Sequence, residues 1–391
     1  MPKKVYLGSS TSVAQKVKKM YVGVDGVARK IKKAYVGVNG IARLFWSGGE
    51  LVYYGTATAL SAARSWIAAT TVGNYAMFGG GVNGYTSSSS VLNVYSTTLT
   101  RQNLTLPSNM GNNAATTIGD YALFGGGWSY SESYEDDYGD TYSDTTEVSN
   151  VYAYNTNLTR TTATSLTLGR YYLAAITVGN YALFAGGVTE NDNVIAYHTT
   201  VNAYNTSLTR STPTALTTSG SHIAATSIRS YALFGGIGAS RARTVVNAYN
   251  TSLTRSTPTA LSVGRYDMAA TSVGDYALFA GGYEMGNRYS TVDAYDSSLT
   301  RSTPTALSVW KDGLAGTTIG EYALFGGGET SGAEKSAIVD VYDTNLTRTT
   351  ITSLSVPRIH LAATTVGNYS IFAGGIDNNT YSNVVDVYTI D

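Results

Sequence analysis

The residues best suited to chemistry lie in a short stretch that recurs along the chain with a different chemistry each time. One copy reads GRYDMAATSVGDYALFAGG (264–282), in which a nearly invariant segment follows Arg265, Tyr266 and Asp267. The copies align on the pair of small residues Ala269-Ala270. Two places before the first residue of this pair, the seven copies carry Trp66, Asn112, Tyr172, His222, Asp267, Gly313 and His360. Two places earlier still, they carry Arg64, Met110, Arg170, Gly220, Arg265, Lys311 and Arg358.

Aromatic, imidazole, carboxylate and cationic groups at such variable positions suit the recognition of a carbohydrate or another polar polymer. Rings stack on sugar faces, and a few polar groups fix the orientation of a ligand. The alternative is that surface loops vary because nothing constrains them. The first view predicts these ligand-binding residues: Arg64, Trp66, Asn112, Arg170, Tyr172, His222, Arg265, Asp267, Lys311 and His360.

Enzyme and metal signatures are sparse. The chain has no cysteine and three histidines, and it contains no HExxH, GxSxG or phosphate-loop motif. We therefore expect a non-enzymatic protein with no catalytic residue, cofactor or metal. Residues 128–149 hold seven acidic side chains that suit calcium, but their spacing is not that of an EF-hand, and a solvated tyrosine-rich loop explains them equally. Those acids are Glu132, Glu135, Asp136, Asp137, Asp140, Asp144 and Glu147.

The repeat that presents these residues predicts an all-β fold. A Y-[AS]-[MLI]-F-x-G-G core occurs seven times, at intervals of 45 to 60 residues, and a V-x-x-Y segment follows each copy. Each unit reads as four short strands separated by turn residues, as in AATSV, YALFAGG, VDAY and RSTPTALS. Four strands at this period predict a seven-bladed β-propeller. The paired small residues suit the innermost strand, where blades crowd the axis.

The order of strands assigns the loops to faces. The fourth-to-first and second-to-third connections should share one face, which therefore carries all the variable segments. The opposite face carries near-invariant turns, so we expect a scaffold on one side and a diversified rim on the other.

The chain ends after the third strand of the seventh unit, whereas YYGTATALS (53–61) matches a fourth strand. We predict that this segment closes the ring by pairing with the last blade, which leaves no open edge there.

Residues 1–50 differ in charge from the rest, with ten basic and two acidic residues in a chain that has 26 of each overall. Asp25-Gly26 and Asn39-Gly40 lie between short apolar runs, which predicts two-residue β-hairpins. We divide the chain into a basic hairpin module for attachment or oligomerisation (1–46), a linker (47–50) and the propeller (51–391).

Two resemblances extend this interpretation. The strand that ends in paired glycines, followed by a tyrosine-bearing strand, resembles the kelch repeat over 51–391, although Leu-Thr-Arg stands where kelch units usually have a tryptophan. The segments YVGVDGVAR and YVGVNGIAR resemble the front of tail-associated, receptor-binding or baseplate proteins of phages and prophages of Gram-positive bacteria.

The second resemblance implies host recognition by a virion tail. The implied partners are a host-surface glycan or protein on the variable face and tail or baseplate proteins on residues 1–46, and a homo-oligomer is possible. We expect no nucleic-acid partner from the balanced charge and no membrane partner, because no apolar run is long enough to span one. We find no signal peptide, so the expected location is the virion, or the bacterial cytoplasm before lysis. The alternatives are a mutarotase-like sugar-active enzyme, with His222, His360, Asp267 and Arg265 as acid–base groups, and a bacterial protein-binding scaffold.

Overall fold

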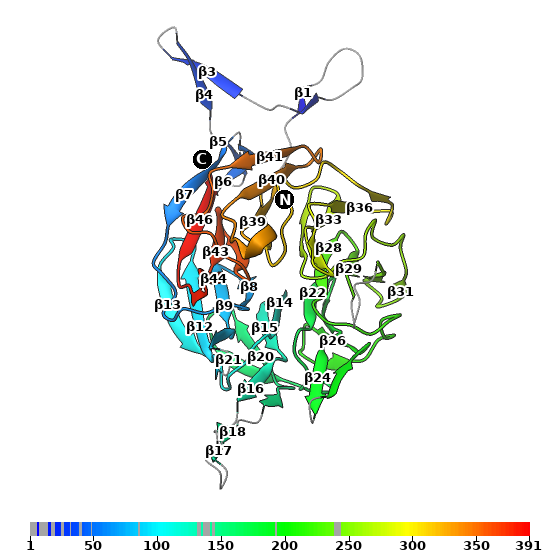
Figure 1. Cartoon of the computed structure of the whole chain (residues 1–391). Coiled ribbons are helices and arrows are strands. Elements are labelled where there is room, and N and C mark those ends of the chain that lie inside the picture. The colour runs from blue at the N-terminus through cyan, green and yellow to red at the C-terminus, as the bar shows by residue number, and fades with distance from the viewer. Residues whose placement is uncertain are drawn as a thin grey trace.

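The protein is a seven-bladed β-propeller, seen in a computed structural model as seven four-stranded sheets arranged in a ring (Figure 1). The structure describes residues 49–391 except 85–86, 131–133, 136–140, 143–144, 192–193 and 238–243. For β1–β6, β17 and β18 it describes the backbone alone.

Each blade begins with a five-residue strand nearest the axis. The seven first strands are β8 (Ala68–Val72), β14 (Ala114–Ile118), β22 (Ala174–Val178), β28 (Ala224–Ile228), β32 (Ala269–Val273), β38 (Ala315–Ile319) and β42 (Ala362–Val366). The second strands are β9 (Tyr75–Gly79), β15 (Tyr121–Gly125), β23 (Tyr181–Ala185), β29 (Tyr231–Gly235), β33 (Tyr276–Ala280), β39 (Tyr322–Gly326) and β43 (Tyr369–Ala373). Within each blade the two pair antiparallel over five residues, as Ala269 does with Ala280 and Val273 with Tyr276.

The outer half of each blade holds the third and fourth strands. The third strands are β12 (Val91–Ser96), β20 (Val151–Asn155), β26 (Val201–Asn205), β30 (Val246–Asn250), β36 (Val292–Asp296), β40 (Val339–Asp343) and β46 (Val385–Ile390). The fourth strands are β13 (Arg101–Thr105), β21 (Arg160–Ala163), β27 (Arg210–Ser211), β31 (Arg255–Ser256), β37 (Arg301–Ser302), β41 (Arg348–Ile351) and, for the last blade, β7 (Leu51–Thr56). The two-residue strands end just before Pro213, Pro258 and Pro304, because proline has no N–H to donate to a strand ladder.

The ring closes as the sequence predicts. Strand β7 pairs antiparallel with β46, so a segment from before the first blade completes the seventh sheet. The pairing skips Tyr54, and Gly55 has a φ of 120° at this bulge, a conformation that glycine adopts readily. Tyr53 lies opposite Tyr388, the register at which other blades place their Leu-Thr-Arg arginine, and its hydroxyl donates to Asp386.

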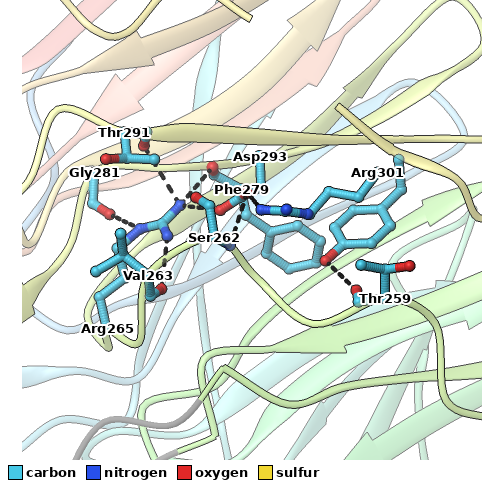
Figure 2. A network of polar contacts seen from close by, with 10 residues as sticks. Thr259, Ser262, Val263, Arg265, Phe279, Gly281, Thr291, Asp293 and Arg301 are labelled. Carbon is cyan, nitrogen blue, oxygen red and sulfur yellow. Dashed lines mark hydrogen bonds and ion pairs between the residues drawn. The ribbon is translucent and has the colours of Figure 1, made fainter. Parts of the chain in front are cut away.

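Third-strand tyrosines link neighbouring blades. Each is buried, and its hydroxyl donates to a threonine carbonyl in the segment before its own first strand, as Tyr295 does to Thr259 at 2.8 Å (Figure 2). All seven blades make this bond, from Tyr95, Tyr154, Tyr204, Tyr249, Tyr295, Tyr342 and Tyr388. Buried hydroxyls need such partners, so the tyrosines explain why the V-x-x-Y segment recurs.

The near-invariant turns have a structural cause of their own. In the third-to-fourth turns an Asn, Asp or Ser side chain accepts two backbone N–H bonds, as Asn205 does from Ser207 and Thr209, and the leucine between them has a φ near 60°, as in Leu208 (61°). A Cβ at Gly179, in a first-to-second turn, would lie 2.8 Å from Thr251 of the next blade. The uniformity of this face therefore reflects packing, and it does not by itself show that the variable face binds a ligand.

The second-to-third connections form small hairpins on the variable face. They are β10 (Val82–Gly84) with β11 (Ser87–Ser88), β16 (Trp128–Tyr130) with β19 (Thr145–Glu147), β17 (Tyr134–Glu135) with β18 (Thr141–Tyr142), β24 (Val188–Asn191) with β25 (Val194–Tyr197), β34 (Tyr283–Glu284) with β35 (Asn287–Arg288), and β44 (Ile376–Asp377) with β45 (Thr380–Tyr381). The sixth blade has instead a short 3-10 helix, η1 (Ser331–Ala333). Bridges such as Tyr266 to Tyr283 join these hairpins to the fourth-to-first connections, so both kinds of loop share one face, as expected.

The expected N-terminal hairpins are present. β1 (Tyr6–Leu7) pairs with β2 (Gln15–Lys16), β3 (Met20–Val24) with β4 (Val27–Ile31), and β5 (Lys33–Val38) with β6 (Ile41–Ser47). Val24 pairs with Val27 and Val38 with Ile41, which confirms two-residue connections at both sites. Among the described residues η1 is the only helix, and it is far too short to cross a membrane.

Candidate functional site

Seven equivalent backbone positions form a ring where the first strands begin. All seven have a left-handed backbone, with φ between 52° and 59°. Their amides link one blade to the next: Tyr172 N–H donates to the Asn112 carbonyl, and His222 N–H donates to the Tyr172 carbonyl, both at 3.1 Å. Left-handed residues other than glycine are uncommon, so the fold holds these positions firmly. The ring residues are Trp66, Asn112, Tyr172, His222, Asp267, Gly313 and His360.

These seven residues surround one cavity on the variable face. Its volume is about 210 Å³, below the roughly 300–1,000 Å³ typical of sites for drug-sized ligands. It therefore suits one small group, such as a single sugar ring or a head group. The residue after each ring position completes the lining: Ile67, Asn113, Leu173, Ile223, Met268, Leu314 and Leu361. The structure thus brings together Trp66, Asn112, Tyr172, His222, Asp267 and His360, as the sequence predicted, although binding by them stays a prediction.

Four rings from four blades gather in this cavity. Trp66 stacks on His360 with centroids 3.6 Å apart, and Tyr172 stacks on His222 at 3.9 Å. The two stacks meet edge to face, with Trp66 and Tyr172 centroids 5.5 Å apart. Gly313 leaves room for this arrangement, because a Cβ there would lie 2.8 Å from Cδ2 of His360.

Burial shifts the ionisation of the cavity groups toward their neutral forms. It raises the pKa of Asp267 to about 7 and lowers the pKa of His222 to about 4. The pKa of His360 falls to about 3, mainly through burial and also through His222 and Lys335. Burial, with a smaller contribution from Asp267, raises the pKa of Tyr172 to about 12. Near neutral pH the imidazoles are uncharged and Asp267 is close to half-ionised.

Two buried amide side chains in the cavity wall have polar atoms without hydrogen-bond partners. Asn112 and Asn113 are each 8% exposed, and no partner within the described part of the chain satisfies Asn112 Oδ1 or either polar atom of Asn113. His360 Nδ1 is also buried and unpartnered there. Such groups normally find partners, so they mark atoms that a polar ligand could satisfy. Asn113 was not among the predicted residues, although it is the one polar residue at a position that is apolar in the other six blades.

The predicted cationic residues lie elsewhere, which corrects that part of the prediction. Arg64, Arg170, Arg265 and Lys311 are 0% exposed and do not line the cavity. Arg265 Nε donates to the Gly281 carbonyl at 2.7 Å and Nη2 pairs with Asp293 at 2.9 Å (Figure 2). Each cation stands two positions before its ring residue, and its side chain turns into the blade to bind carbonyls at the end of the second strand.

The partner of each cation lies in its third strand, two residues before the tyrosine. Arg64 and Arg170 meet the neutral Asn93 and Asn202, whereas Arg265, Lys311 and Arg358 meet carboxylates. The carboxylates are Asp293, Asp340 and Asp386. In the second blade both charges are absent, and Met110 and Tyr152 pack in one cluster. The cation position and the third-strand position therefore change together between blades. This joint change is a signal of a buried pair that the sequence contains and that our prediction did not use.

The calcium hypothesis for residues 128–149 concerns acidic side chains that lie outside the described residues, apart from Glu147. The described residues contain no cluster of three metal-ligating side chains. The side chains of residues 1–48 also lie outside the described part, so the module's attachment role is untested.

Comparison with known proteins supports the fold alone. No protein-family model matches the chain, and no curated protein matches it. Among solved structures, the one titled "Structure of YjhT" matches with a TM-score of 0.55 at 11% sequence identity, covering 76% of this chain and 99% of that one. At this identity the likeness extends to the arrangement of blades and does not transfer a ligand or an activity.

Proposed function

We propose that this protein is a non-enzymatic binding module that recognises a small polar group, such as one unit of a surface glycan, in the cavity of its variable face. The observation that carries the proposal is the ring of left-handed positions, which directs aromatic rings and unpartnered polar atoms from successive blades into one cavity. Aromatic walls with a few polar groups are typical of ligand sites. The resemblance of the N-terminal segment to tail-associated proteins extends this proposal to recognition of a host surface by a virion tail. In that setting residues 1–46 attach the propeller to tail or baseplate proteins.

The test is a glycan array, together with binding to intact bacteria, using the full chain. The double variant Trp66→Ala/Tyr172→Ala removes one ring from each stack and should abolish binding. The matched control is Arg229→Ala on the opposite face, an exposed residue paired with Asp275 at 2.6 Å, whose loss has little effect on stability. Unchanged binding by the double variant, or loss of binding in the control, would place the site elsewhere.

A second function is a sugar-active enzyme that uses the same cavity. Asp267 favours it, because a carboxyl group with a pKa of about 7 can both donate and accept a proton near neutral pH. Arg265 drops out of the earlier acid–base set because it is fully buried. NMR of sugar anomers separates the two functions: interconversion that Asp267→Asn abolishes supports the enzyme, and binding without turnover supports the module.

A further inference from the structure

The cavity has a one-sided charge. Of the described residues that line it, Asp267 alone carries charge at neutral pH, and no lysine or arginine is among them. The two imidazoles stay neutral because their pKa values lie at about 3 and about 4. A negatively charged ligand would therefore meet a carboxylate and no cation.

Asp267 differs from the neighbouring acids in having no partner. Asp293 pairs with Arg265 and Asp312 pairs with Arg288, whereas the Asp267 carboxylate forms no hydrogen bond or ion pair in the part of the chain that the structure describes. Asp267 contributes to the raised pKa values of three nearby groups, Tyr172 from the third blade, Tyr266 beside it and Asp312 of the sixth blade. His222 and His360 complete the titratable lining. None of these groups supplies a positive charge.

We propose that the cavity selects a ligand group that carries an ammonium ion, held by the carboxylate of Asp267 and the rings of Trp66 and Tyr172. This inference rests on the proposed function and adds the charge of the ligand. A cation is attracted to the face of an aromatic ring, most strongly to that of tryptophan, and a buried carboxylate without a partner is costly until a cation pairs with it. Asn112 Oδ1 and His360 Nδ1 are further acceptors for an ammonium or hydroxyl hydrogen.

Ammonium binding should be coupled to the ionisation of Asp267. Burial keeps much of this carboxyl protonated near neutral pH, and a bound cation favours the carboxylate, so binding releases a proton. If only the carboxylate binds, a pKa of about 7 makes affinity rise about tenfold between about pH 6 and about pH 8.

The test is calorimetric titration of the full chain with choline, whose charge does not titrate, and with dimethylbutanol, its uncharged carbon isostere. We expect choline to bind, with affinity that rises about tenfold over that pH interval, and the isostere to bind at least about tenfold more weakly. Asp267→Asn should abolish both the preference and the pH dependence. It copies Asn112, which has the same left-handed backbone, so the variant should fold. Arg229→Ala is the matched control.

A second arm identifies the source of the ammonium group. D-Glucosamine that binds more tightly than N-acetyl-D-glucosamine near neutral pH points to an amino sugar, and choline binding without this preference points to a quaternary head group. Equal binding of choline and its isostere, or a preference that survives Asp267→Asn, would overturn the inference. If a neutral glycan binds and Trp66→Ala/Tyr172→Ala abolishes that binding, the inference fails and the proposed function stands.

Discussion

The buried pair of Arg265 and Asp293 offers a test in which the chain supplies its own control. Both side chains are 0% exposed. Arg265 also donates to the carbonyls of Val263, Phe279, Gly281 and Thr291. Arg265→Met leaves these carbonyls and one carboxylate oxygen without their partner. Breaking a buried pair from one side typically costs about 3–5 kcal/mol. We expect the low end, about 3 kcal/mol, because Ser262 N–H and Arg301 still donate to the other oxygen of Asp293.

The second blade shows how the same site is built without charge. Met110 replaces the cation and Tyr152 replaces the acid, and the Tyr152 hydroxyl bonds to Ser108. The triple variant Val263→Ser/Arg265→Met/Asp293→Tyr copies this solution into the fifth blade. It should recover most of the loss, because apolar replacements of both partners are often neutral or stabilising.

The assay is urea denaturation of the three proteins at neutral pH, followed by far-ultraviolet circular dichroism. The single variant should unfold at lower urea with an unchanged slope, and the triple variant should return close to wild type. A loss below about 1 kcal/mol in Arg265→Met, or a triple variant no better than the single one, would refute the buried-pair reasoning. Ligand binding by the folded triple variant should be unchanged, because Arg265 does not line the cavity.

Three further predictions test closure, charge and pH. Deleting residues 1–56 removes β7 and exposes the edge of β46, so calorimetry should show a lower melting temperature and lost cooperativity, whereas deletion of 1–48 should leave the propeller transition in place. Asn202→Asp places a carboxylate beside Arg170, whose guanidinium has a neutral partner, and should stabilise the fold by about 1 kcal/mol at neutral pH in urea titrations; a loss of stability would contradict the reasoning. Because the pKa of Asp267 is raised, the folded state retains a proton that the unfolded state releases. The contribution of this protonation to the stability of the fold is complete below pH 3.8 and is lost as pH rises to about 7. Asp267→Asn should therefore melt above wild type at about pH 8, with the difference shrinking toward about pH 4; a difference independent of pH would contradict this.

The repeat allowed most of the fold to be predicted, because seven copies of one pattern report strand order, turn positions and ring closure together. Blade number, the pairing of β7 with the last blade and the shared face of the variable loops are confirmed. The ring positions could be identified from the sequence because they differ between the seven copies, whereas the residues that follow them are nearly invariant.

The cationic positions were assigned to the wrong surroundings. Arg265 stands two positions before Asp267, and both positions vary between the blades, so their closeness in sequence suggested that both side chains are exposed. The left-handed backbone at Asp267 and the carbonyls at the end of β33 instead turn the guanidinium inward. Neither feature can be read from residue types in a single copy, although the matched change of Arg265 with Asp293 and of Met110 with Tyr152 across blades contained the signal.

The fluorescence of Trp66 tests the central claim, that ligands bind at the ring, most directly. Replacing Trp46, Trp128 and Trp310 by phenylalanine leaves Trp66 as the only tryptophan, inside the cavity. Titration with the glycan or ammonium probe that calorimetry identifies should shift its emission saturably, with the same midpoint as the heat of binding. Binding heat with unchanged Trp66 emission would contradict the claim.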